Sequence, residues 1–120
     1  MMSKIINLTQ HTATPEQVAA GVVEPSDKEE VRRLLTFDEP PTKADYIIRA
    51  NALADLAKKA GADAAMIGGA PYFMSSLEIA LEYQGIKPLY SFTRRESVDM
   101  LQADGSVRKV AVFKHVCFVE

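Results

Sequence analysis

Three short apolar segments alternate with longer segments of helical pattern, and this order constrains the fold more than any other feature. The apolar segments are residues 4–8, 62–67 and 88–92. Each is too short and too abruptly bounded to be a helix, so we predict buried strands. Strands that alternate with helices are typical of a parallel sheet with right-handed crossover connections. The sequence therefore predicts an α/β fold, with an open, mainly parallel sheet flanked by helices.

Each helical segment begins at a capping residue or a proline and ends at a glycine or a proline-rich break. Thr14, Pro15 and Gln17 have the pattern of a capping box, and the first helix is expected from there to about residue 20. The later helices are expected after a second box at Ser26, after the capping residue Thr42, and from Pro71. The predicted helix ends are Gly21, residues 37–41, Gly61 and Gly85.

The last third of the chain has the pattern of a strand, a loop and a β-hairpin. Residues 93–96 follow the third strand and predict a polar loop. Residues 97–102 and 107–113 then predict two hairpin strands that turn at Asp104-Gly105. Residues 115–120 are suited to extend the second of these strands. The fold prediction therefore includes a C-terminal β-hairpin.

Length, charge and cysteine content exclude several classes of protein. The chain has 120 residues, which suits a single domain over residues 1–120. Its net charge of −2 argues against binding long nucleic acids, because many phosphates would have to be neutralised. The only cysteine, Cys117, permits no intrachain disulfide, and no apolar stretch is long enough for a signal peptide or a membrane span. We expect a cytoplasmic protein with no cofactor, no metal and no membrane partner.

The predicted fold indicates where a ligand would bind. In an open parallel sheet, ligands lie beyond the carboxyl ends of the strands. That rule selects residues 9–11, 68–72 and 93–95, each of which follows a predicted strand. These segments are chosen by position and not by residue type.

Two of these segments carry groups suited to an anion. The Gly68-Gly69 turn precedes a helix, whose first backbone amides attract phosphate or carboxylate, although a tight structural turn would use the same residues. No complete dinucleotide or P-loop motif is present. Arg94 and Arg95 offer guanidinium groups that grip phosphate oxygens; alternatively, they are solvated side chains paired with Glu96.

The remaining candidates each have two interpretations. His11 is suited to general acid or base catalysis near neutral pH, or to capping the helix that follows it. Tyr72 either packs in the core or stacks on a base. His115 is interpreted as a structural side chain, and Cys117 has no basic neighbour that would make it a nucleophile.

Three segments carry a resemblance to a known family. Residues 11–17, 88–96 and 112–118 resemble the small stand-alone CRISPR-associated proteins with a CRISPR-associated Rossmann-like (CARF) fold. That group includes ring nucleases, which bind and cut cyclic oligoadenylate messengers. The resemblance implies a Rossmann-like fold and a homodimer that binds a ring of phosphodiesters across its two-fold axis. It also implies metal-independent cleavage, in which a ribose 2′-hydroxyl attacks its own phosphate. Residues 22–45 have no counterpart in that family.

The resemblance and the predicted sheet edge together define the candidate site. The candidate catalytic residues are His11, Ser91 and Arg94. The candidate ligand-binding residues are Thr9, Gln10, Gly68, Gly69, Tyr72, Thr93 and Arg95. Two other functions stay open: a module that binds a nucleotide or another small anion without cutting it, and a structural or partner-binding protein.

Overall fold

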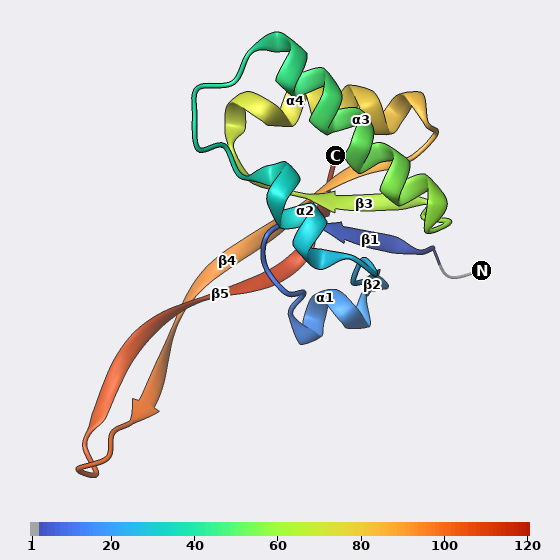
Figure 1. Ribbon diagram of the computed structural model, residues 1–120. Coiled ribbons are helices and arrows are strands. Elements are labelled where there is room, and N and C mark those ends of the chain that lie inside the picture. Colours follow the sequence, from blue (N-terminus) through green and yellow to red (C-terminus); the bar gives the residue numbers. More distant parts are fainter. Residues whose placement is uncertain (1–2) are drawn as a thin grey trace.

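A computed structural model describes residues 3–120 and contains one five-stranded sheet with four helices (Figure 1). The strands lie in the order β2-β1-β3-β4-β5; β1 to β4 are parallel, and β5 runs antiparallel to β4. The predicted α/β fold, with its mainly parallel sheet and C-terminal hairpin, is confirmed. The elements are β1 (Ile5–Leu8), α1 (Pro15–Ala19), β2 (Val22–Val23), α2 (Lys28–Leu35), α3 (Lys43–Lys59), β3 (Ala64–Ile67), α4 (Pro71–Tyr83), β4 (Lys87–Leu101) and β5 (Val107–Val119).

Local capping chemistry starts the helices close to where the sequence predicts. Capping boxes are present at Thr14 in front of α1 and at Thr42 in front of α3. The predicted box at Ser26 is wrong by one residue, because Asp27 is the capping residue of α2. Its carboxylate accepts the backbone N–H of Glu30 at 3.0 Å, and a carboxylate is also favoured by the helix dipole.

Strand β2 is absent from the sequence prediction. It consists of two residues at the sheet edge, where Val22 and Val23 pair with Ile5 and Ile6 of β1. A run this short has no periodicity of its own. Its strand conformation comes from pairing with β1, which is a tertiary effect.

The predicted polar loop at residues 93–96 is wrong. These residues belong to β4, which continues without interruption from Lys87 to Leu101. Each of them has a partner in β5, from Thr93 opposite His115 to Glu96 opposite Val112. Polar side chains are compatible with a strand whose backbone groups are paired across the ladder. The predicted turn at Asp104-Gly105 is confirmed, since it joins β4 to β5 and Gly105 has a φ of +87°.

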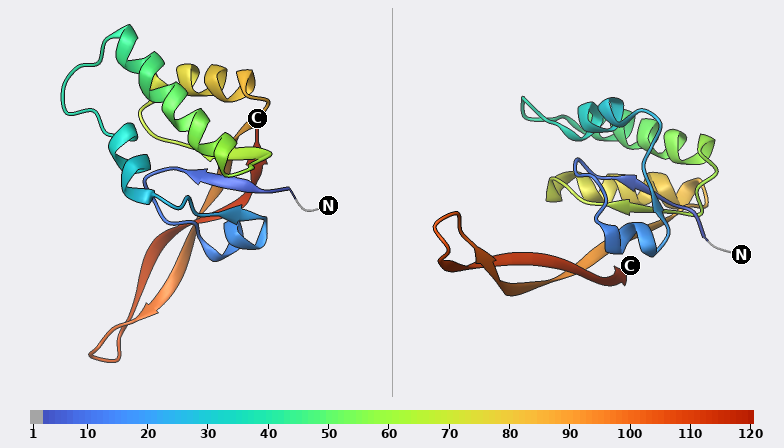
Figure 2. Two further views of the ribbon diagram at one scale, coloured as in Figure 1. Left: turned by 45° about the vertical axis from the view of Figure 1, so that its right-hand side comes forward. Right: turned by 90° about the horizontal axis from the view of Figure 1, so that it is seen from below.

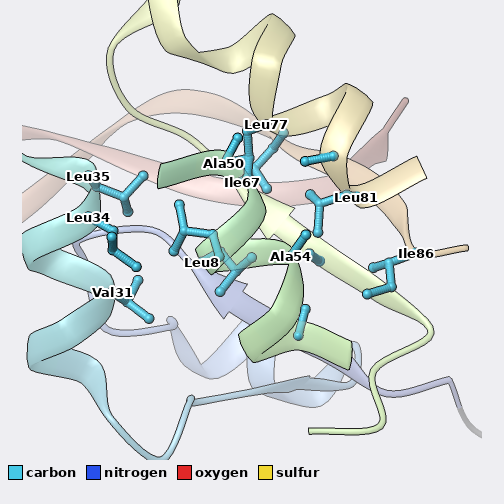
Figure 3. Packing of buried hydrophobic residues seen from close by; sticks show 14 of the residues in the cluster. Leu8, Val31, Leu34, Leu35, Ala50, Ala54, Ile67, Leu77, Leu81 and Ile86 are labelled. Carbon is cyan, nitrogen blue, oxygen red and sulfur yellow. The ribbon is translucent and has the colours of Figure 1, made fainter. Parts of the chain in front are cut away.

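The sheet has a thick layer of helices on one face and a thin layer on the other (Figure 2). Helices α2, α3 and α4 bury the larger core cluster against β1 and β3, and Figure 3 shows its packing. On the other face, beside α1, the smaller cluster contains Ile5, Val22, Ala64 and Met66, with Phe118 packed against it. In residues 3–120, no helix is long and apolar enough to cross a membrane.

The hairpin formed by β4 and β5 extends well beyond this body (Figures 1 and 2). The Cα radius of gyration is 16.5 Å, whereas a compact domain of this length would have one of about 14 Å. Only the base of the hairpin contributes to the core clusters, through Leu89, Tyr90 and Phe118. The outer part of the hairpin is therefore a projecting arm.

Candidate ligand-binding site

The strand order places a switch point between β1 and β3. From β1 the chain moves to β2 on one side, and it later returns to β3 on the other side of β1. Ligands of open α/β sheets bind at such a point, beyond the carboxyl ends of the strands. A pocket of about 460 Å³ lies there. It is lined by Thr9, Gln10, His11, Thr12, Thr14, Gln17, Met66, Ile67, Gly68, Gly69, Tyr90, Ser91, Thr93 and Phe113.

A buried asparagine shapes the loop that follows β1. Asn7 has no exposed surface, and its Oδ1 accepts hydrogen bonds from the Thr9 backbone N–H (3.0 Å) and the Thr9 hydroxyl (2.7 Å). Its Nδ2 donates to the backbone carbonyl of His11 at 2.8 Å. A fully buried amide is stable only when its donors and acceptor are satisfied. Asn7 thereby folds residues 9–11 back over the end of β1.

Glu24, directly after β2, ties this loop to the neighbouring strand. Its carboxylate accepts from Asn7 Nδ2 (3.1 Å) and from the backbone N–H of Ala13 (2.7 Å), and it pairs with Lys28 Nζ at 3.2 Å. Burial raises the pKa of the Glu24 carboxyl, but the hydrogen bonds from Ala13, Asn7 and Lys28 lower it by more. The pKa therefore lies below its ordinary value of 4.5.

Two cations of α2 hold the carbonyl oxygens of the same loop. Lys28 Nζ donates to the carbonyls of Thr9 (2.8 Å) and His11 (3.0 Å), and Arg32 Nε donates to that of Gln10 (3.4 Å). These carbonyls therefore already have cationic donors from α2. Carbonyl oxygens are the backbone groups that would repel a phosphate, so this arrangement favours an anion at the pocket.

The turn after β3 forms the opposite wall of the pocket. Gly69 has a φ of +147°, a conformation that favours glycine, whereas Gly68 does not have a positive φ. Helix α4 begins directly after this turn; its capping residue, Ala70, makes no side-chain hydrogen bond to it, and its first turn has no acidic residue. Within residues 3–120, the first N–H groups of α4 are thus without a side-chain acceptor, at the end of the helix that attracts anions.

Ser91 is held between two side chains from distant elements. Gln17 Nε2 donates to Ser91 Oγ at 3.2 Å, and Ser91 Oγ lies 2.5 Å from Nδ1 of His115. The capping box fixes the orientation of this amide, because Gln17 Oε1 accepts the backbone N–H of Thr14 at 3.0 Å. The serine oxygen accepts from Gln17, and its contact with His115 is a hydrogen bond whose donor is set by the imidazole tautomer: the hydroxyl donates when Nδ1 is unprotonated and accepts when Nδ1 carries the proton. Ser91 therefore has an adjacent imidazole, which can act as a base in the tautomer that leaves Nδ1 unprotonated.

A β-bulge allows His115 to reach Ser91. Phe92 lies opposite Cys117, but Thr93 lies opposite His115, so Val116 is an extra residue in β5. In a regular strand, His115 and Phe118 would point to opposite faces because they are three residues apart. The bulge changes this alternation, and the two rings pack together with centroids 4.6 Å apart.

The pocket contains seven of the residues that the sequence predicts for the site: Thr9, Gln10, His11, Gly68, Gly69, Ser91 and Thr93. Three others lie outside its lining. Tyr72 packs against Phe37 in an aromatic cluster, with ring centroids 5.6 Å apart, and lines a separate hollow. Arg94 and Arg95 are on strand β4 rather than on a loop, and both are exposed. Their role in phosphate binding stays a prediction.

Two residues that organise the site, Gln17 and His115, are not indicated by the sequence. Gln17 carries a capping signal only, and nothing in the local sequence indicates that its amide also contacts Ser91. His115 was interpreted as structural, because the position of the bulge cannot be read from a run of residues without clear alternation. In residues 3–120, no group of three His, Cys, Asp or Glu side chains is placed to hold a metal ion.

Comparisons with known proteins give the family and nothing more specific. Neither the curated proteins nor the solved structures include one that matches the chain. The resemblance to CARF proteins receives no support from these comparisons and stays a hypothesis. A family model does match residues 3–119, which is nearly the whole chain. The chain therefore belongs to the uncharacterized protein MJ1673 family.

Proposed function

We propose that the pocket at the carboxyl ends of β1 and β3, beside residues 90–93 of β4, binds a cyclic oligoadenylate, and that the protein cleaves it without a metal ion. The resemblance of residues 11–17, 88–96 and 112–118 to CARF proteins is the reason for choosing an adenylate ring. A ring with two-fold symmetry is best bound by two copies of the chain, so this proposal includes a homodimer.

The observation that carries the proposal is the chemistry of the pocket lining. Of the described residues that line it, none is Asp, Glu, Lys or Arg, and most carry a hydroxyl, an amide or a glycine backbone. Such groups donate hydrogen bonds to phosphate and to base edges without adding negative charge. A hollow at the amino end of β4 is lined by three carboxylates, those of Glu78, Glu82 and Glu120, and by one cation, Lys87, which pairs with Glu120. That hollow would repel a phosphodiester, so the acid-free pocket is the better site.

Ser91 and His115 supply the groups for the cleavage step. In that step the ribose O2′ forms a bond to its neighbouring phosphorus, and the bond from phosphorus to O5′ breaks, which leaves a 2′,3′-cyclic phosphate. The 2′-hydroxyl proton passes to the Ser91–His115 pair, and the leaving O5′ takes a proton from His11, which lines the pocket. The pocket also accelerates the reaction by positioning the 2′-hydroxyl in line with the leaving oxygen.

A second candidate function is binding without cleavage. It is favoured by the positions of Arg94 and Arg95, which lie outside the pocket lining. A pocket without a lining cation stabilises the charge of a transition state through backbone amides and hydroxyls alone, which is a weaker means than a guanidinium. A sensor of the messenger would not need that stabilisation.

The experiment is incubation of the protein with cyclic tetra-adenylate or hexa-adenylate in EDTA, with products resolved by chromatography. We expect linear products with a 2′,3′-cyclic phosphate end. Ser91→Ala and His115→Gln should each slow their formation about a hundredfold, while Ser75→Ala on the exposed side of α4 should not. Binding without products would favour the sensor. If neither binding nor products are observed, cyclic oligoadenylate is not the ligand. Unchanged rates in Ser91→Ala and His115→Gln would remove the pair from the mechanism.

A further inference from the structure

Strand β4 has a long edge without a partner. Strand β3 pairs with β4 only as far as Met66 opposite Leu89. Beyond that point β4 continues to Leu101, and β5 is its only partner strand among residues 3–120. The backbone groups on the other side of residues 92–101 are therefore available for pairing with another strand.

The arm also exposes apolar side chains on both of its faces. Leu101 is 74% exposed and Phe113 is 68% exposed, and Phe92, Met100 and Val107 are exposed as well. An isolated two-stranded hairpin is at best marginally stable in water, and three or more strands with a buried face are needed for stability. The arm extends away from the body, which leaves its outer part without cover from the rest of the chain (Figure 2).

We propose that a second copy of this chain pairs with this edge, β4 against β4, antiparallel and about a two-fold axis at Ser97. The product is a four-stranded sheet in which each β5 lies on the outside. The proposal does not depend on what the pocket binds, since none of residues 96–101 lines it. The proposed role of the arm is therefore dimer formation.

The charges along β4 select this register. With the axis at Ser97, Arg95 lies opposite Asp99 of the second copy, and the symmetry produces this pair twice. An axis at Arg95 would pair Arg94 with Glu96 twice, but Glu96 already pairs with Lys114 of its own chain and Arg95 would lie opposite itself. An axis at Glu96 would place that carboxylate opposite itself. An axis at Val98 would leave Arg95 opposite Leu101. Within residues 3–120, neither Arg95 nor Asp99 makes an ion pair, so both remain available to the second copy.

The other edge of the arm is unsuited to the same pairing. Strand β5 carries Arg108, Lys109 and Lys114 and no acidic residue. Two copies of β5 could therefore form no ion pair between them, and an axis at Ala111 would place Arg108 against Lys114. The bulge at Val116 also interrupts its ladder, and lysines and bulges are the features that protect sheet edges from pairing. Dimer formation through β4 is favoured by comparison.

Cysteine crosslinking tests the axis directly. In a Cys117→Ser background, which has no other cysteine, Ser97→Cys would place two cysteines opposite each other across the axis. Opposed residues in antiparallel strands have Cα atoms about 4.5 to 5.5 Å apart, which suits a disulfide. We expect Ser97→Cys to form a covalent dimer on mild oxidation. Ala111→Cys, opposite Ser97 on β5 and equally exposed, should stay monomeric on a denaturing gel.

Charge exchange tests the register by sedimentation of the uncrosslinked protein. Asp99→Arg places arginine against arginine twice, and we expect it to weaken the dimer about tenfold or more. The double variant Arg95→Asp and Asp99→Arg restores opposite charges and should recover the dimer. Arg108→Glu, a charge reversal of equal size and opposite sign on the outer strand, should leave the dimer intact.

Several results would overturn the proposal. They are a wild-type chain that sediments as a monomer at every concentration, crosslinking through Ala111→Cys but not Ser97→Cys, and a double variant that fails to recover the dimer. A monomer that binds a single-stranded RNA through the arm would replace dimer formation with nucleic-acid binding. The whole hairpin, residues 87–119, has six Lys and Arg against three Asp and Glu.

Discussion

Asn7 and Glu24 show how single polar residues set the shape of the pocket. Neither lines it, yet Asn7 fixes the loop after β1, and Glu24 connects that loop to the end of β2 and to Lys28 of α2. Buried polar groups of this kind are costly unless every donor and acceptor is satisfied. Among the described residues, no buried side-chain nitrogen or oxygen lacks a hydrogen-bond partner. The loop therefore has a defined conformation before any ligand arrives.

The lowered pKa of Glu24 predicts a pH dependence of stability. A carboxyl whose pKa is lower in the folded protein stabilises the fold above its unfolded pKa, and this contribution disappears as the pH falls through the folded pKa. Glu24→Gln should therefore lower the free energy of unfolding at pH 7, and the difference from wild type should shrink below about pH 4.5. Urea unfolding at several pH values measures this. Glu39→Gln, in the exposed loop before α3, is the control. A difference that stays constant from pH 7 to 3 would contradict the prediction.

At the scale of elements, the sequence predicts what local chemistry controls. The capping boxes at Thr14 and Thr42 and the glycine of the Asp104-Gly105 turn act within a few residues, and their elements lie where they were expected. Strand β2 and the continuity of β4 depend on pairing with other strands, so their local sequence does not reveal them. The same holds for the site: six lining residues follow from their positions after the predicted strands, whereas Ser91 lies within one of those strands and its contact with His115 requires the bulge.

The turn between β3 and α4 gives a matched pair of glycine substitutions. Gly69 has a φ of +147°, so Gly69→Val would be strained whatever the surrounding space. A Cβ at Gly68 would lie 3.7 Å from Thr9 Cγ2, an ordinary contact, and its φ needs no glycine. Gly69→Val should lower the free energy of unfolding by about 1 to 3 kcal/mol, and Gly68→Ala by less than about 1 kcal/mol. Chemical denaturation measures both. Equal losses would show that φ at Gly69 does not control this turn.

The whole molecule consists of a packed body and an arm with separate roles. The body holds both core clusters and the pocket, and it assembles the pocket from strand ends that lie far apart in the sequence. The arm contributes little to the core but carries the unpaired edge of β4 and an excess of cations in a chain of net charge −2. If these roles are separable, the arm can be shortened without loss of the fold.

Shortening the arm tests this separation. Arg95 and Phe113 face each other, so replacement of residues 96–112 by Asn-Gly would close the hairpin with a two-residue turn. The core residues of the hairpin, Tyr90 and Phe118, are retained, and we expect the free energy of unfolding to change by less than about 1 kcal/mol. Thr93 and Phe113 are also retained, so the pocket lining of each chain stays complete. Dimer formation should disappear, because the axis at Ser97 is removed, and light scattering would then give the mass of a single chain.

A smaller cut, with Asn-Gly in place of residues 102–106, keeps the edge of β4 and should keep the dimer. A shortened chain that fails to fold would mean that the arm stabilises the body, and one that still forms dimers would place the interface elsewhere.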